Sequence, residues 1–152
     1  MPATPLIQRI LVPHDFGETA EHALHYALEL AEKVGASVTV MHAYEYPVLN
    51  YPEGPAITAE LVRQVHDAAS AALEGIVVRS KRPAVSVTGV LRQGSTWSEI
   101  LAAAGEAKAD LIVIGTHGRR GLSRALLGSV AEKVVRASPC PVLTVHGPAG
   151  ER

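Results

Sequence analysis

The stretch GTHGRRGLSRALLGS, from Gly115 to Ser129, follows the apolar run DLIVI and contains four glycines, three arginines and one histidine. Gly115, Gly118, Gly128 and Ser129 form the pattern G-x2-G-x9-G-S. Glycine loses more backbone freedom on folding than any other residue, so this spacing is typical of a backbone that closely approaches a ligand. Gly128 and Ser129 also open a helical pattern, and the unpaired N–H groups at a helix start favour an anion. The loop therefore predicts a phosphate-binding site.

Other phosphate-binding signatures do not fit this loop. It lacks the GK[ST] of a Walker-type loop, and its first glycines are spaced G-x-x-G-x-x-G where a dinucleotide fold has G-x-G-x-x-G. The Ser129 hydroxyl is expected either to cap its helix or to donate to a phosphate. Arg119, Arg120 and Arg124 either neutralise phosphates or are solvated loop charges, and the sequence leaves both interpretations open.

Histidines and the single cysteine offer no convincing catalytic or metal-binding set. His117 is the loop residue able to transfer protons near neutral pH, but no carboxylate or serine has a matching spacing, so we expect a phosphate or solvent contact. His22 and His25 are three residues apart among glutamates, which indicates a solvated helix face. Cys140 stands between two prolines and is interpreted as a small buried residue. Structural roles are expected for the other histidines that follow or end apolar runs, His14, His42 and His146.

Short aliphatic runs alternate with amphipathic segments along the chain. The runs have strand length and β-branched content, and they cover residues 7–12, 36–43, 84–91, 110–115 and 141–145. This alternation predicts parallel β-α-β units, hence an open, doubly wound α/β sheet with four helices on its two faces. Ligands of such sheets bind at the carboxyl ends of the strands, here PHD, HAYEY, RQGS and the glycine loop.

The helices show start and stop signals of different kinds. In the first, apolar residues recur at helical spacing over residues 20–34, and Gly35 is the expected C-terminal cap. The second is predicted over residues 58–79. The third and fourth carry capping-box spacing, Thr96 with Glu99 and Ser129 with Glu132.

Composition narrows the class of protein. The chain has 152 residues, 47% of them hydrophobic, which suits one domain. Fourteen basic and fifteen acidic residues leave a net charge of −1, so nucleic acid and membrane are not expected partners. One cysteine excludes an internal disulfide, and no apolar run approaches the roughly 18 residues of a membrane span. We therefore predict a cytoplasmic protein.

Four segments together resemble the nucleotide-binding branch of the universal stress protein family. They are ILVPHDFGETAEHALHYALELA, GSTWSEIL, the G-x2-G-x9-G-S loop and SPCPVLTV, in this order along nearly the whole chain. The resemblance implies a five-stranded parallel sheet of order 3-2-1-4-5 and one nucleotide-binding domain over residues 1–152. It also implies ATP, ADP or AMP as the ligand, with Mg²⁺ or Mn²⁺ bound through the phosphates.

The resemblance assigns roles to individual residues. Asp15 contacts the ribose, Pro13 lies beside the base, and the backbone of Val40 meets the adenine edge. From its position alone, Asp15 is instead expected to cap the turn into the first helix. The remaining predicted contacts, to ribose and phosphates, are Gly115, Thr116, His117, Gly118, Arg119, Gly128, Ser129 and the backbone of Val130. The family resemblance further implies a homodimer through the last strand, Val142–Val145.

Two classes of function follow from these predictions. The first is an ATP-binding regulatory protein of the stress response, a nucleotide-dependent switch or sensor with an unidentified protein partner. The alternative is a slow ATP hydrolase or phosphotransfer enzyme, which generally needs Mg²⁺ ligands and a group that positions the attacking oxygen. Apart from Asp15, no acidic residue falls at a strand end near the loop, so we expect no catalytic residues and at most very slow hydrolysis. A response regulator is excluded because no aspartate ends the third strand.

Overall fold

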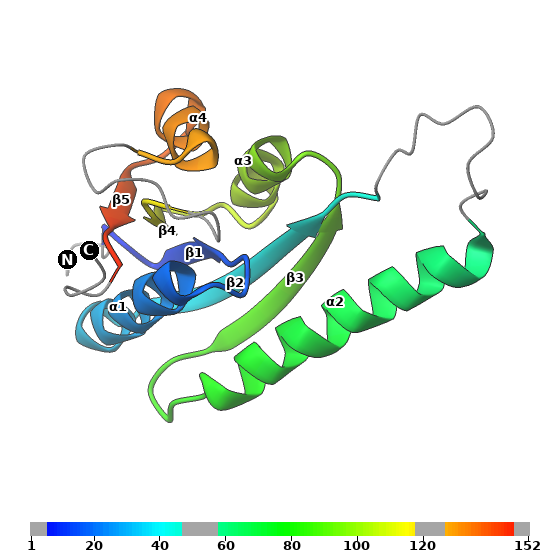
Figure 1. Cartoon of the computed structure of the whole chain (residues 1–152). Helices are drawn as coiled ribbons and strands as arrows, with labels where there is room; N and C mark the ends of the chain where they lie inside the picture. Colours follow the sequence, from blue (N-terminus) through cyan, green and yellow to red (C-terminus); the bar gives the residue numbers. More distant parts are fainter. Residues whose placement is uncertain (1–5, 47–57, 118–126, 148–152) are drawn as a thin grey trace.

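A computed structural model describes residues 6–46, 58–117 and 127–147 of the chain (Figure 1). Strands and helices alternate throughout, as the sequence predicts. In chain order they are β1 (Arg9–Pro13), α1 (Glu18–Val34), β2 (Ser37–Tyr44), α2 (Ala59–Arg79), β3 (Val87–Gln93), α3 (Thr96–Glu106), β4 (Leu111–Gly115), α4 (Ser129–Ala137) and β5 (Val142–Val145).

The five strands form one parallel sheet of order β3-β2-β1-β4-β5, which confirms the predicted order. β1 lies in the centre, with Val12 opposite Val40 of β2 and Leu11 opposite Ile112 of β4. The chain winds from β1 outward to β2 and β3, and then returns to β4 on the other side of β1. Connections therefore diverge beyond the carboxyl ends of β1 and β4, which opens a crevice at that point.

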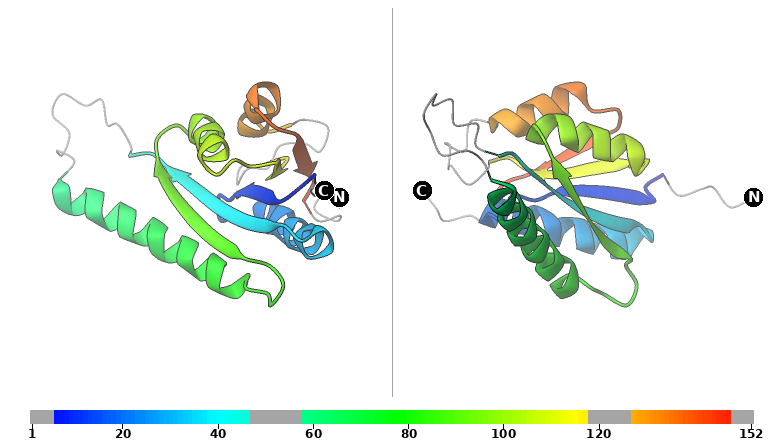
Figure 2. Two further views of the ribbon diagram at one scale, coloured as in Figure 1. Left: turned by 180° about the vertical axis from the view of Figure 1, so that it is seen from behind. Right: turned by 90° about the vertical axis from the view of Figure 1, so that its right-hand side faces the viewer.

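Helices cover both faces of the sheet (Figures 1 and 2). Successive side chains of a strand point to opposite faces, so Ile10 and Val12 of β1 pack with the buried residues of α1 and α2. Leu11 points the other way and packs with Ile100 of α3 and Val134 of α4. Strands buried on both sides explain the uninterrupted apolar runs in the sequence.

The end of α1 agrees with the prediction, with one exception. Gly35 adopts a left-handed conformation (φ 75°), and its N–H donates to the carbonyl of Ala31. The buried stripe runs over Ala20, Ala23, Leu24, Ala27, Leu28 and Ala31. Val34 is 36% exposed, because no further helical turn follows to cover it.

Both predicted capping boxes are wrong. Ser95 is the N-cap of α3 and Gly128 that of α4, and neither helix has a side-chain cap hydrogen bond. Thr96 and Ser129 are the first helical residues, one position too late for a capping side chain. Glu99 instead accepts a hydrogen bond from Arg92 at 2.8 Å, so its carboxylate joins α3 to β3.

β3 begins at Val87, three residues later than predicted, and continues to Gln93. None of the helices within the described ranges is long and apolar enough to cross a membrane.

Candidate functional site

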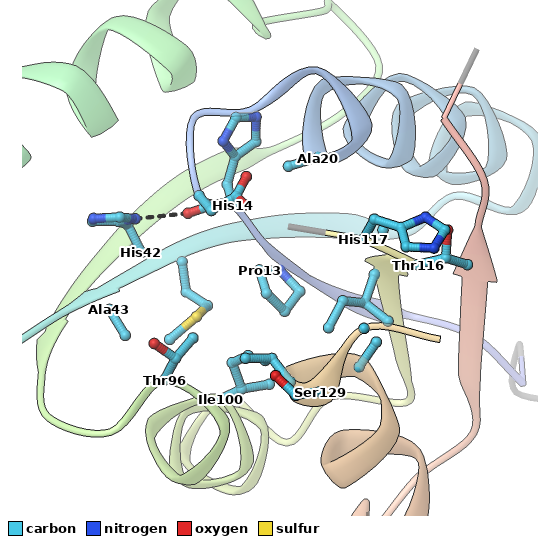
Figure 3. Close-up of a pocket in the computed structure, with 17 residues that line it drawn as sticks. Pro13, His14, Ala20, His42, Ala43, Thr96, Ile100, Thr116, His117 and Ser129 are labelled. Carbon is cyan, nitrogen blue, oxygen red and sulfur yellow. Dashed lines mark hydrogen bonds between the residues drawn. The ribbon is translucent and has the colours of Figure 1, made fainter. Parts of the chain in front are cut away.

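A cavity of about 470 Å³ lies where the carboxyl ends of β1, β2 and β4 meet the starts of α3 and α4 (Figure 3). Its position is the crevice created by the reversal of strand order. Residues from six elements and the turns beside them line it: Pro13, His14, Asp15, Ala20, Met41, His42, Ala43, Thr96, Ile100, Ile114, Gly115, Thr116, His117, Gly128, Ser129, Val130 and Ala131.

Most of the residues predicted for the site line this cavity. They are Pro13, Asp15, Gly115, Thr116, His117, Gly128, Ser129 and Val130. Gly118 and Arg119 lie outside the described residues, as do Arg120 and Arg124. Val40 is not a lining residue, because it lies within β2 with its side chain fully buried in the cluster under α1 and α2. Ala43, three residues further along the same strand, lines the cavity.

The apolar wall of the cavity consists of residues for which the sequence predicted no individual role. Met41 and Ala43 come from β2, and Ile100 comes from α3. Met41 and Ala43 could have been predicted from their place at the carboxyl end of a predicted parallel strand. Thr96 and Ile100 lie in the GSTWSEIL segment that carries the family resemblance, but no site role was predicted for them, because they reach the cavity only through the packing of α3 on β2 and β3 beside α4.

The two ends of the cavity differ in chemistry. Figure 3 shows Ala43, His42 and Thr96 at one end and His117, Thr116 and Ser129 toward the other. The first end also contains Met41 and Ile100, both buried, and offers an apolar slot that suits a flat ring. The other end is made by glycine backbone and the start of a helix, which suits an anion.

Glycine is required at position 128 by close backbone packing. The Gly128 N–H donates to the carbonyl of Thr116 at 2.6 Å, and a Cβ added at this position would lie 2.9 Å from the same oxygen. The start of α4 at Ser129 has no side-chain cap hydrogen bond, so no capping side chain occupies the first backbone N–H groups of this helix. Among described residues, the Ser129 hydroxyl has no hydrogen-bond partner, so it is able to serve a ligand.

The hydroxyl of Thr116 links two histidines at the glycine-rich end. Thr116 is 2% exposed, and its Oγ1 lies 3.1 Å from Nδ1 of His117 and 3.4 Å from Nδ1 of His146. Its backbone N–H donates to the carbonyl of Val145, which ties the end of β4 to β5. The arrangement brings imidazole groups from two strand ends close to the helix start.

Asp15 lies in the tight turn between β1 and α1. Its Oδ1 accepts a hydrogen bond from the N–H of Gly17 at 2.9 Å, as expected from its position before the helix. The residue is half-buried and is one of those that line the cavity. Asp15 therefore stabilises the turn and borders the site at once.

His14 is buried behind that turn. Its Nδ1 accepts a hydrogen bond from the N–H of Phe16 at 2.9 Å, and its carbonyl accepts one from Nδ1 of His42 at 2.7 Å. Nε2 lies 3.0 Å from Oε1 of Glu21, at ion-pair distance but without the alignment of a hydrogen bond. Burial lowers the pKa of His14, and this effect exceeds the opposing influence of the Glu21 and Asp15 carboxylates.

We expect this burial to make stability depend on pH below 6.5. The unfolded chain binds a proton at His14 near pH 6.5, whereas the folded chain does so only at lower pH. The stability gained by burying neutral His14 is therefore fully present above pH 6.5. As the pH falls toward the folded pKa, the free energy of unfolding decreases by up to about 1.4 kcal/mol per pH unit. Urea unfolding of wild type and His14→Asn between pH 7.5 and 5.5 measures it. Parallel curves for the two proteins would contradict the expectation.

Other predicted roles fall outside the cavity. His22 and His25 lie on the exposed face of α1, where His25 contacts Glu29 at 3.1 Å. Cys140 is half-buried rather than buried, because it packs at the rim of the cluster under α3 and α4. In the described ranges, no three His, Cys, Asp or Glu side chains gather in a way that could hold a metal ion.

Comparison with known proteins agrees on one family. A family model described as "Universal stress protein family" matches residues 6–146. A universal stress protein of Thermus aquaticus is 37% identical over 147 residues, which cover 93% of this chain and 100% of the relative. Universal stress protein MJ0531 of Methanocaldococcus jannaschii is 33% identical, over 96% of this chain and 86% of its own.

Solved structures show the same fold. That of protein MJ0577 has a TM-score of 0.82 at 29% identity and covers 95% of this chain and 99% of its own. Two further structures are complexes with nucleotides. One is a universal stress protein with cAMP (TM-score 0.60, 27% identity, 93% and 98% covered), the other the Archaeoglobus fulgidus universal stress protein with dAMP (TM-score 0.60, 25% identity, 92% and 98% covered).

Proposed function

This chain belongs to the universal stress protein family, and on that premise we propose that it binds an adenine nucleotide in the 470 Å³ cavity and acts as a nucleotide-dependent regulatory switch or sensor. The observation that carries the proposal is the cavity itself, with an apolar slot at one end and a glycine-lined helix start at the other. The cAMP and dAMP complexes of similar proteins support the choice of an adenine nucleotide.

Each part of the nucleotide is assigned to a part of the cavity. The base lies in the slot between Met41, Ala43 and Ile100, beside Pro13. Asp15 accepts a hydrogen bond from a ribose hydroxyl. The phosphates meet the backbone at Gly128, Ser129 and Val130, where helix N–H groups favour negative charge.

ATP is the proposed physiological ligand, with ADP and AMP as alternatives. Among the described residues that line the cavity, Asp15 is the acidic one, and the ribose already uses it. Mg²⁺ or Mn²⁺ is therefore proposed to bind through the phosphates. Release of small molecules from freshly purified protein, followed by mass spectrometry, identifies the nucleotide present in the cell.

Binding predicts a stabilisation by ATP that depends on Asp15. At about 100 times its dissociation constant, a ligand adds roughly 2.7 kcal/mol to the free energy of unfolding. Asp15→Ala is expected to weaken ATP binding by about 1.5–3 kcal/mol, the contribution of a hydrogen bond to a charged group. Isothermal titration calorimetry with ATP and Mg²⁺ gives the affinity, and Asp67→Ala on the exposed surface of α2 is the control. Equal affinities for Asp15→Ala and wild type would refute the ribose assignment.

We also propose that ATP is bound far better than it is hydrolysed. Backbone N–H groups bind the ground state and the transition state of ATP hydrolysis about equally. Such contacts raise the affinity for ATP but do not accelerate its hydrolysis. Turnover below roughly 1 s⁻¹ is expected, and His117→Ala is expected to leave both affinity and residual activity nearly unchanged. Multiple-turnover assays at saturating ATP and Mg²⁺ measure this. A higher rate that collapses in His117→Ala with binding intact would favour the alternative, a slow ATP hydrolase or phosphotransfer enzyme.

A homodimer through β5 is the proposed assembly. β5 forms one edge of the sheet, and an edge strand offers unpaired backbone groups to a second chain. Antiparallel pairing of two β5 strands about a two-fold axis would satisfy these groups in both copies at once. The cytoplasmic location and the existence of a protein partner remain predictions from the sequence.

A further inference from the structure

The turn that presents Asp15 contains an unusual backbone conformation. Phe16 has φ 67°, a left-handed conformation that residues with a side chain rarely adopt. Two successive side-chain bonds hold the turn. Nδ1 of His14 accepts from the N–H of Phe16, and Oδ1 of Asp15 accepts from the N–H of Gly17, both at 2.9 Å.

The first of these bonds fixes the protonation state of the ring. A backbone N–H only donates, so Nδ1 of His14 carries a lone pair, and the proton of the neutral ring is on Nε2. Nε2 faces Glu21 of α1 at 3.0 Å, and the Glu21 carboxylate accepts a hydrogen bond from Arg79 of α2. The imidazole is therefore held between the turn on one side and two helices on the other.

Three charged groups act on this imidazole, one from the turn and two from neighbouring helices. They are Asp15 in the turn, Glu21 of α1 and Arg79 of α2, whereas His42 of β2 bonds the backbone carbonyl of His14. Figure 3 shows the ring on the α1 side of the strand end, away from Ser129 and Ile100. His14 therefore acts on the proposed nucleotide site indirectly, through the adjacent Asp15.

We infer that His14 is a positioning residue for nucleotide binding, because its Nδ1 holds Phe16 in the conformation that turns the Asp15 carboxylate toward the ribose. This inference rests on the proposed function. A neutral imidazole accepts the backbone bond, the bond fixes the turn, and the turn sets the affinity for ribose. Loss of the acceptor is expected to remove the preference for ribose and to leave the contacts of base and phosphates in place.

Two substitutions separate the acceptor from the bulk of the ring. His14→Asn keeps an amide oxygen near the place of Nδ1, whereas His14→Leu fills a similar volume without an acceptor. Affinities for ATP and for 2′,3′-dideoxy-ATP, each with Mg²⁺, are measured by isothermal titration calorimetry. Wild type is expected to prefer ATP by roughly tenfold or more, the effect of a hydrogen bond to a carboxylate. His14→Asn keeps this preference. In His14→Leu the preference for ATP falls to about twofold or less. The affinity for dideoxy-ATP is unchanged, and the affinity for ATP drops to the same level.

Circular dichroism first confirms that each variant is folded. If His14→Leu is not, His14→Gln replaces it, since its longer amide lies toward Glu21 and offers no acceptor to Phe16. Three results would overturn the role of His14 while leaving the ribose assignment intact. They are a full ATP preference in His14→Leu, an equal loss of affinity for both nucleotides in that variant, and a His14→Asn variant that behaves like His14→Leu. Equal affinities of the wild-type protein for the two nucleotides would overturn the ribose assignment and this inference together.

Discussion

Gly128→Val is expected to abolish the rise in melting temperature that ATP and Mg²⁺ produce in the wild-type protein. At saturating nucleotide that rise should be roughly 5–11 °C, from about 2.7 kcal/mol in a domain of this size. A Cβ at position 128 meets the Thr116 carbonyl at 2.9 Å, and backbone atoms yield less readily than side chains. The segment must therefore move, and with it the helix start proposed to hold the phosphates. Differential scanning fluorimetry with and without nucleotide measures the effect.

Gly75→Ala is the matched control for this substitution. Gly75 lies within α2, and a Cβ added there meets nothing within 4 Å. Alanine in a helix interior is more favourable than glycine by about 0.5–1 kcal/mol, so the variant should be slightly more stable and keep the full ATP shift. A Gly128→Val protein that melts and responds like wild type would show that close backbone packing at position 128 is unnecessary for binding.

Thr144→Pro is expected to convert the proposed dimer into monomers. Ile112 donates to the carbonyl of Pro141, just before β5, and Thr116 donates to that of Val145 in β5, so these two carbonyls face β4. Backbone groups alternate in direction along a strand, and the N–H of Thr144 therefore points outward, to the edge where a second copy would pair. Proline removes that donor. Each lost donor leaves a carbonyl of the partner copy unpaired, which costs about 1–3 kcal/mol. The two-fold axis produces this loss twice in the dimer, so association should weaken by roughly 30-fold or more.

Analytical ultracentrifugation across a range of concentrations measures the association. Thr144→Val keeps both the donor and a β-branched side chain, and it should remain dimeric. Val145→Pro is the less informative change, because the N–H of Val145 faces β4 and its loss would disturb the sheet itself. Wild-type protein that sediments as a monomer at high concentration would contradict the dimer proposal.

Local sequence information determined the elements and the general place of the site. Short uninterrupted apolar runs mark the strands buried on both faces, and a period of 3.6 residues marks the buried stripe of α1. Gly35 marks a left-handed turn that glycine tolerates best. The end of a parallel strand is set by the same pattern. Pro13, Asp15 and Gly115 were therefore placed correctly at the strand ends that border the cavity.

Tertiary structure decided which distant residues complete the site and how each one is used. Thr96 and Ile100 reach the cavity because α3 packs on the same face as α4, an arrangement that depends on contacts far apart in the chain. The helices also begin at other positions than local spacing favoured: Ser95 and Gly128 are the N-caps, not Thr96 and Ser129. His14 looked like any structural histidine at a strand end. Its proposed role at the turn rests on the bond that its Nδ1 accepts from Phe16, and the ring is held there by Glu21 and Arg79, which two different helices bring behind it. Burial and charge at one ring are set by every element packed against it, so no local pattern shows them.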